Sequence, residues 1–357
     1  MIKQVGKSIF IEKDIQINQN WTALKAHLAT KGHHIDLSSA PRQFAAGFGN
    51  INYYVLFDGA PAVLRRPPMG PVTPGSNDML REGKILESLA EAFHLAPQCL
   101  YIGRDLSILG APFLIMEYRP GLIIHSKMPD DLRDKAEAAK KLSEELVNIL
   151  AELHAIKPDS IGLEGLGRPS EYLARTARGW LKRADFAWQD SRPVAVSKIQ
   201  AWLENNLVEE QPAVLLHNDF KLDNIILDPT DLKPRALIDW DLGTRGDALW
   251  DLAVLLSYWA QPGDPEPMMN LKQMPTLEVG FPDRQSVIEQ YAQRTARDLS
   301  NIRFCRVLAQ FRLAVVFQQI FLRYKDTEEV NKRAAAFDKL SIGLLDFAVE
   351  ISEGTFR

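Results

Sequence analysis

A stretch near the middle of the chain, Leu215–Pro229, sets polar residues that could do chemistry between two apolar runs. It reads LLHNDFKLDNIILDP, so Asp219 follows His217 by two residues and Asn224 follows Asp219 by five. Fifteen residues after Asn224, a third apolar run, LIDWD, reaches Asp239. Short apolar runs bounded by polar residues predict short buried strands. The sequence therefore indicates strands that end in carboxylates and an amide.

Phosphoryl transfer needs groups of these kinds. A carboxylate can orient or deprotonate the attacking hydroxyl, and Mg²⁺ binds oxygen ligands, commonly one or two carboxylates plus substrate phosphates. Asn224 and Asp239 meet the requirement for such a metal site. Any one of these residues alone would equally suit a surface turn, so the prediction depends on their joint order and spacing.

A second candidate site lies upstream, in AGFGNINYYV. Here Gly47, Gly49 and Asn50 fall between two predicted strands. Glycines let backbone N–H groups come close to phosphates. The third glycine of a G-x-G-x-x-G loop is missing, so a plain hairpin turn is an equally good interpretation.

The elements that must position these residues change in character along the chain. Residues 20–34 have apolar residues at helical spacing, and residues 42–68 predict two strands joined by an Asp58-Gly59 turn. An amphipathic helix is predicted at 77–93, and two more strands are predicted at 99–118. Helices are predicted at 132–156, 169–183 and 194–207, short strands return near the opening stretch, and helix dominates from Ala248 onward. We therefore expect an α+β fold with an N-terminal lobe of residues 1–118 and a mainly helical lobe of residues 119–357, which meet in EYRPG.

The composition is that of an ordinary globular protein. Of its residues, 46% are hydrophobic and 25% are charged. Its length, 357 residues, is more than one hydrophobic core usually supports. A net charge of −4 provides no global signal for nucleic acid or membranes. Cys99 and Cys305 suit two buried thiols in a reducing compartment, and the charged N-terminus lacks the apolar core of a signal peptide, so we expect a cytoplasmic protein. The most apolar helix, residues 306–324, contains Arg312 and is expected in the core.

Four segments together resemble a known family. HNDFKLDNIILDP, LIDWDLGTRGDALWDLA, DSIGLEGLGRPSEYL and LGAPFLIMEYRPG are similar, in the same order, to the aminoglycoside phosphotransferase family of protein-kinase-like small-molecule phosphotransferases. Within it they look most like the phosphotransferase domains associated with acyl-CoA dehydrogenases, over residues 20–350. The resemblance implies a two-lobe protein-kinase-like fold, ATP and Mg²⁺ as cofactors, and a small-molecule hydroxyl as acceptor.

The resemblance also implies roles for the residues of the opening stretch. Asp219 would be the catalytic base, Asn224 a metal ligand and Asp239 the principal Mg²⁺ ligand. His217 would brace the loop without reacting, and Lys221 would lie near the γ-phosphate.

For the nucleotide, AVLRR lies where protein kinases carry V-A-I-K, so Arg65 takes the place of the lysine and Glu82 is placed to pair with it. A surface ion pair of little energetic value is the alternative. The backbone of Glu117 and Tyr118 would lie near the adenine, and Gly47, Gly49 and Asn50 would form the nucleotide loop.

Asp247 and Asp251, in GDALWDLA, would anchor the metal-binding segment to the helical lobe, although Asp251 also suits a plain charge at a helix N-terminus. His154 is expected to be a packed histidine. Two positions depart from the family: Asn218 stands where glycine is usual, and Gly83 stands in a helix where a larger residue is common.

The acceptor is the least predictable feature. Residues 261–325 contain nine basic and six acidic residues. A positive surface favours an anionic acceptor, such as a hydroxyacyl-CoA, over a polycationic aminoglycoside, although a solvated helix face explains the same count. A resistance kinase and a nucleotide-binding module without catalysis stay open as alternatives. The long loop at residues 261–282 could cover the site or be mobile.

Overall fold

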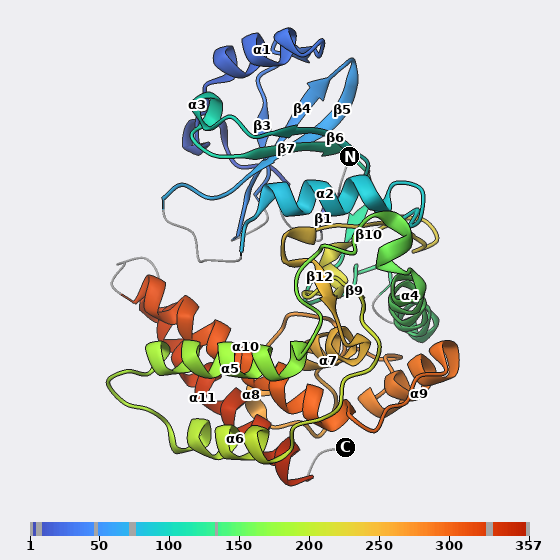
Figure 1. The fold of residues 1–357 in the computed structure, drawn as a ribbon, viewed down its shortest axis with the longest axis vertical. Coiled ribbons are helices and arrows are strands. Elements are labelled where there is room, and N and C mark those ends of the chain that lie inside the picture. The colour runs from blue at the N-terminus through green and yellow to red at the C-terminus, as the bar shows by residue number, and fades with distance from the viewer. Residues whose placement is uncertain are drawn as a thin grey trace. The chain divides into compact units, whose positions relative to one another are not determined.

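The computed structural model describes residues 3–4, 9–45, 49–70, 76–132, 135–325 and 331–354. The chain forms two compact units, and each contains several segments of the sequence (Figure 1). Unit 1 comprises Met1–Ile124, Asp159–Glu164 and Asp223–Gly243, and unit 2 comprises His125–Pro158, Gly165–Leu222 and Thr244–Arg357.

An antiparallel sheet forms the core of unit 1, with strand order β2-β4-β5-β7-β6 and with β3 also paired to β4. Its strands are β2 (Ile35–Asp36), β3 (Arg42–Gln43), β4 (Ile51–Phe57), β5 (Ala60–Arg66), β6 (Cys99–Gly103) and β7 (Phe113–Glu117). Buried and half-buried residues alternate along β4. Such alternation is expected when one face of a sheet packs on the core. The predicted turn joins β4 to β5, with Asp58 at φ 49° and Gly59 at φ 80°.

Helices cover this sheet. α1 (Trp21–Thr30) begins where Asn20 accepts a hydrogen bond from the Ala23 N–H at 3.0 Å. α2 (Met79–Leu89) contacts β6, and a Cβ added at Gly83 would lie 2.6 Å from Ile102 Cδ1. Glycine in α2 therefore allows a close approach of helix to strand. Between β6 and β7 the structure has a short helix, α3 (Leu106–Leu109), where the sequence indicates only a turn.

A second, smaller sheet belongs to the same unit. Its order is β1-β8-β10-β11, with β1 (Lys3–Gln4), β8 (Leu122–Ile123), β10 (Ile225–Leu227) and β11 (Pro234–Leu237). β10 and β11 pair with Ile225 opposite Leu237. Short 3-10 helices complete unit 1, at Lys13–Ile15 (η1) and Trp240–Leu242 (η4). Two more, η2 (Pro158–Ile161) and η3 (Leu222–Asn224), lie where the chain passes between the units.

Unit 2 is mainly helical. Its one two-stranded sheet among the described residues pairs β9 (Val214–Leu216) with β12 (Thr244–Gly246). The helices are α4 (Ala136–Ala155), α5 (Tyr172–Ala187), α6 (Val194–Asn205), α7 (Ala248–Tyr258), α8 (Glu266–Met269), α9 (Arg284–Thr295), α10 (Ile302–Tyr324) and α11 (Asn331–Glu353).

The long helices α10 and α11 lie side by side, and α10 also contacts α7 and α5 (Figure 1). In the described part of the chain, one helical segment, Ile302–Arg323, is long and apolar enough to cross a membrane, and 72% of it is buried inside the protein. This burial identifies α10 as a core helix of unit 2, as its sequence predicts.

Candidate active site

Arg65 of β5 joins two carboxylates in unit 1. Its Nε donates to Glu82 Oε2 at 2.8 Å, and its Nη2 donates to Asp239 Oδ1. Arg65 and Glu82 are buried, whereas the Asp239 side chain is 37% exposed. The ion pair between Arg65 and Glu82 is therefore an internal one, and the surface alternative does not hold.

Burial and the charges of its neighbours set the ionisation of this cluster. Burial raises the pKa of Glu82 to about 7, Arg65 opposes this rise, and the charges of Asp239 and Asp241 add to it. Burial alone would lower the pKa of Arg65, but Asp239 and Glu82 hold it above its ordinary value. Arg65 is thus a permanent cation that faces the exposed carboxylate of Asp239.

Asn224 and Asp239 flank the same end of the β10–β11 ladder. The Ile238 N–H donates to the Asn224 carbonyl at 2.9 Å, one residue beyond the pair of Ile225 and Leu237. Asp239 has φ 72°, in the left-handed region that few residues other than glycine adopt. Such strain is often found at functional sites.

The loop predicted to hold phosphates is only partly described. Gly47 lies outside the described residues. Gly49 is exposed, and its carbonyl accepts a hydrogen bond from Asn77 Nδ2 at 2.7 Å. Asn50 is buried, and its Nδ2 donates to Asp241 Oδ2 at 3.0 Å.

Asp241 was not predicted as a site residue. Its Oδ2 also accepts from the Asn77 N–H at 3.1 Å, and the carboxylate is buried. Burial, and next the charge of Asp239, raise the pKa of Asp241. The signal was present in LIDWD, where a second aspartate follows Asp239 by two residues.

A cavity of about 120 Å³ opens in unit 1 beside this cluster. Its apolar walls come from both sheets, with Val63 and Met116 on one and Ile123 and Ile226 on the other. The full lining is Ile9, Phe44, Asn52, Val63, Arg65, Pro97, Met116, Glu117, Tyr118, Arg119, Ile123, Ile226, Ile238 and Asp239. A mostly apolar slot with a few charged groups at one side is typical of small-ligand sites, and it contains the predicted residues Glu117 and Tyr118.

Asp219 is the centre of a separate cluster in unit 2. Its Oδ1 accepts from the Tyr258 hydroxyl at 3.1 Å and from Arg312 Nη2 at 3.3 Å, and Lys221 Nζ lies 3.4 Å from Oδ2. The Asp219 side chain is 19% exposed, and that of Arg312 is 7% exposed. Burial opposes ionisation, but the charges of Lys221, Arg312 and His217 outweigh it and hold the pKa of Asp219 well below its usual range.

Arg312 and Tyr258 were not predicted as site residues. They come from α10 and α7, 93 and 39 residues from Asp219 in the sequence. Arg312 sits in a strongly apolar helix, where a single buried arginine is costly unless it is paired. That contrast is the one sequence signal that could have indicated it.

The predicted supporting residues hold the Asp219 loop within unit 2. Asp251 of α7 accepts from the backbone N–H groups of His217 at 2.6 Å and Asn218 at 2.8 Å. Asn218 has φ 70°, a conformation that asparagine tolerates better than most residues. His154 Nε2 lies 3.5 Å from Asp251 Oδ2, and its Nδ1 lies 2.7 Å from the Tyr291 hydroxyl.

Asp247 plays a related part as the N-cap of α7. Its Oδ1 accepts from the Leu249 N–H at 2.9 Å, and its Oδ2 accepts from the Gln211 N–H at 3.0 Å. Asp247 therefore fixes the start of the helix that carries Asp251.

The predicted site residues thus form two sets. Asn224 and Asp239 belong to unit 1, and Asp219 and Lys221 belong to unit 2. Within the ranges that the structure describes, no three His, Cys, Asp or Glu residues gather as a metal-binding group. Asn224 and Asp239 are an amide and one carboxylate, so they are not a group of this kind, and phosphate oxygens would have to complete the ligand shell of a Mg²⁺ ion that they held.

Comparison with known proteins identifies the family to which the chain belongs. The model of the "Phosphotransferase enzyme family" matches residues 41–287, which is more than half of the sequence. The chain belongs to this family. Among curated relatives, acyl-CoA dehydrogenase family member 11 of Gallus gallus is 28% identical over 87% of this chain and 40% of its own length. The rat member 11 is 31% identical over 79% of this chain and 36% of its own length. The chain thus spans well under half of these relatives.

Solved structures confirm the predicted fold. A structure described as a candidate aminoglycoside phosphotransferase from Ralstonia eutropha superposes with a TM-score of 0.76 at 24% identity, covering 94% of this chain and 99% of that one. A thermostable mutant of aminoglycoside phosphotransferase APH(4)-Ia, in complex with AMP-PNP and hygromycin B, has a TM-score of 0.58 at 17% identity, covering 93% and 99%. The fold is the two-lobe α+β fold of kinase-like phosphotransferases. By family, the chain belongs with the phosphotransferases.

Proposed function

We propose that the protein transfers the γ-phosphate of ATP, with Mg²⁺, to a hydroxyl group of a small anionic molecule. The observation that carries this proposal is the ionised Asp219, held among cationic and aromatic side chains in unit 2. A carboxylate in this state can accept the proton of an attacking hydroxyl, while the cations around it favour an acceptor of negative charge.

The nucleotide side of the proposal rests on unit 1. The apolar slot offers an apolar lining for a purine, and Arg65 in the same lining offers a planar, permanently charged group for phosphate oxygens. AMP-PNP occupies the related APH(4)-Ia complex, which favours a nucleotide here too. We propose that the phosphate donor is ATP and not GTP.

Asn224 and Asp239 would hold the Mg²⁺. They fit because both residues contain oxygen atoms, which Mg²⁺ prefers, and both lie at one end of the β10–β11 ladder. The Asp239 carboxylate is also partly exposed. When bound, the metal would supply positive charge that neutralises the phosphate oxygens during transfer. Removing Mg²⁺ with a chelator is therefore expected to abolish turnover.

The charge around Asp219 supports the choice of an anionic acceptor. Arg183 and Arg312 lie on the Trp180 ring, with guanidinium carbons 4.5 and 5.8 Å from its centroid. Lys221 is the third cation of the group. A polycationic aminoglycoside would meet repulsion here, whereas a carboxylate or a coenzyme A phosphate would be attracted. The curated relatives are named as acyl-CoA dehydrogenases, which makes hydroxyacyl-CoA compounds the first acceptors to test.

The test is a screen for acceptor-dependent ADP release with acyl-CoAs, sugars, amino alcohols and aminoglycosides. Turnover with an anionic acceptor, lost in Asp219→Asn and kept in the exposed-site control Asp190→Asn, is the expected result. Arg183→Gln should raise KM for that acceptor about tenfold, since one charge contact is worth roughly 1.4 kcal/mol, and Lys182→Gln should not.

Two results would replace the proposal. Turnover confined to aminoglycosides would indicate a resistance kinase, which the hygromycin B complex of the APH(4)-Ia neighbour keeps as the second candidate. Nucleotide binding with no turnover on any acceptor would indicate a binding module. Expression in a sensitive bacterial host, followed by measurement of aminoglycoside resistance, separates the first of these from a metabolic role.

A further inference from the structure

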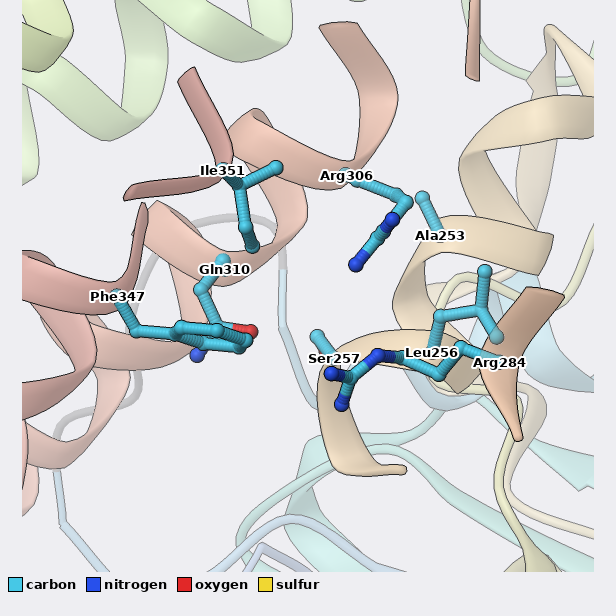
Figure 2. A pocket seen from close by; sticks show the side chains of 8 residues that line it. All are labelled: Ala253, Leu256, Ser257, Arg284, Arg306, Gln310, Phe347 and Ile351. Atoms are coloured by element: carbon cyan, nitrogen blue, oxygen red, sulfur yellow. The ribbon is translucent and has the colours of Figure 1, made fainter. Parts of the chain in front are cut away.

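A second cluster of positive charge lies inside unit 2, in a pocket whose lining contains none of the residues assigned to catalysis. α7, α9, α10 and α11 enclose a small pocket lined by Ala253, Leu256, Ser257, Arg284, Arg306, Gln310, Phe347 and Ile351 (Figure 2). Both arginine side chains extend toward its centre, with Phe347 and Gln310 on one side and Leu256 and Ser257 on the other.

The two arginines are deeply buried but differ in their partners. Arg284 is 1% exposed; its Nη1 donates to Asp264 Oδ2 at 2.7 Å and to the Trp259 carbonyl at 2.6 Å. Arg306 is 8% exposed, and among the described residues its guanidinium makes no hydrogen bond or ion pair, although the charge of Asp264 attracts it. One guanidinium group is therefore paired with a carboxylate and the other is not, which leaves a net positive charge in the pocket.

An unpaired buried charge is costly. Removing an ion from water without a partner is strongly unfavourable, so buried charges are paired in nearly all native proteins. Arg306 nevertheless keeps its proton. Burial, and next the charge of Arg284, lower its pKa only to about 10, which leaves it charged at neutral pH. Arg284 adds a further unsatisfied donor, since its buried Nε has no hydrogen-bond partner in the described structure.

We propose that this pocket is a binding site for a small oxyanion, a carboxylate or phosphate group held by Arg306 and by the Nε of Arg284. The planar guanidinium matches both groups with paired hydrogen bonds, and buried polar groups without a protein partner are commonly satisfied by a bound ion. The site is distinct from the proposed nucleotide and acceptor sites, and its occupancy stabilises unit 2.

The size of the pocket limits the ligand. The space between the lining side chains is about 180 Å³, including the part that opens to solvent. The side chains as they stand leave no room for a whole water molecule. Binding therefore requires the long Arg306 side chain to adopt another rotamer and vacate space for the anion. A nucleotide or a coenzyme A moiety is far too large.

The test measures thermal unfolding of the full chain in sodium phosphate, sodium acetate or sodium chloride at matched ionic strength. In the wild type, an oxyanion at ten times its Kd should raise Tm by roughly 2 °C, because it binds only the folded state. The three salts distinguish a phosphate site from a carboxylate site. No rise with either oxyanion beyond that of chloride would overturn the proposal.

Two substitutions localise the effect. Arg306→Met removes the unpaired charge, so Tm should rise without added anion and no longer respond to it. Arg323→Met, the same change at an exposed position of α10, should respond as the wild type does. An equal anion response in Arg306→Met and wild type would refute the assignment.

A third variant keeps the test decisive if Arg306→Met does not fold. Gln310→Glu introduces a carboxylate of nearly the same shape into the pocket and should replace the anion. We expect it to unfold at a higher temperature than the wild type and to lose the anion response. A Gln310→Glu protein that is destabilised and still responds would count against the site.

Discussion

Removal of the Asp219 charge should affect both stability and catalysis, and the two effects can be separated. Asp219→Asn keeps the shape of the side chain but removes the counter-charge of Arg312, whose side chain is 7% exposed. Arg312 Nη2 then has an amide at 3.3 Å in place of a carboxylate. Asp219→Ala would also open a space, so the asparagine variant is the cleaner change.

The expected magnitudes follow from this burial. Breaking a buried ion pair from one side costs about 3–5 kcal/mol, and the 19% exposure of Asp219 favours the lower end, about 3 kcal/mol. A second substitution, Arg312→Met, removes the orphaned charge, so the double variant should recover about 2 kcal/mol relative to additive losses. Loss of the base should lower kcat by about 10²–10⁴, or roughly 3–5 kcal/mol of transition-state stabilisation, and the double variant should not regain it.

Urea unfolding of the four proteins of this double-mutant cycle measures the coupling energy, and acceptor-dependent ADP release measures kcat. Stability losses that simply add would show that Arg312 and Asp219 do not depend on each other. Turnover in Asp219→Asn close to that of the wild type would refute its assignment as the base, whatever its stability.

Three other predictions concern residues around these clusters. Arg65→Lys should raise KM for the nucleotide about tenfold, measured by ADP release, because a lysine cannot bridge two carboxylates with a planar group. Asn218→Gly should lower the free energy of unfolding by about 1–3 kcal/mol, because Trp250 Nε1 loses the Asn218 Oδ1 acceptor that lies 2.5 Å from it. This loss is expected even though the backbone φ of 70° suits glycine, and an unchanged urea midpoint would contradict it. Burial lowers the pKa of His154 from 6.5, although the hydrogen bond to Asp251 opposes this shift. The unfolded chain therefore binds a proton that the folded chain does not, and stability is lost as pH falls below about 6.5. In His154→Gln, the change in Tm between pH 7.5 and 5.5 should be smaller; an equal change would refute this account.

Local pattern was sufficient for most of the elements. The Asp58-Gly59 turn, the amphipathic helix around Leu86 and the apolar runs around Asn224 carry their structural preference within a few residues, because strand alternation, helical periodicity and turn chemistry are short-range properties. The order and spacing of Asp219, Asn224 and Asp239 likewise pointed to the phosphotransferase family, which the comparisons confirm. Their individual roles stay predictions.

Tertiary structure decided which distant groups share an environment. No local pattern shows that residues 223–243 fold with the N-terminal segment, that Asp241 meets Asn50, or that Arg312 of an apolar helix lies against Asp219. Nor could the excess of basic residues at 261–325 show that Arg284 and Arg306 are both buried and line one pocket. Side-chain charge can be read from the sequence, but its energy depends on burial and on partners that only the folded chain brings within a few ångströms.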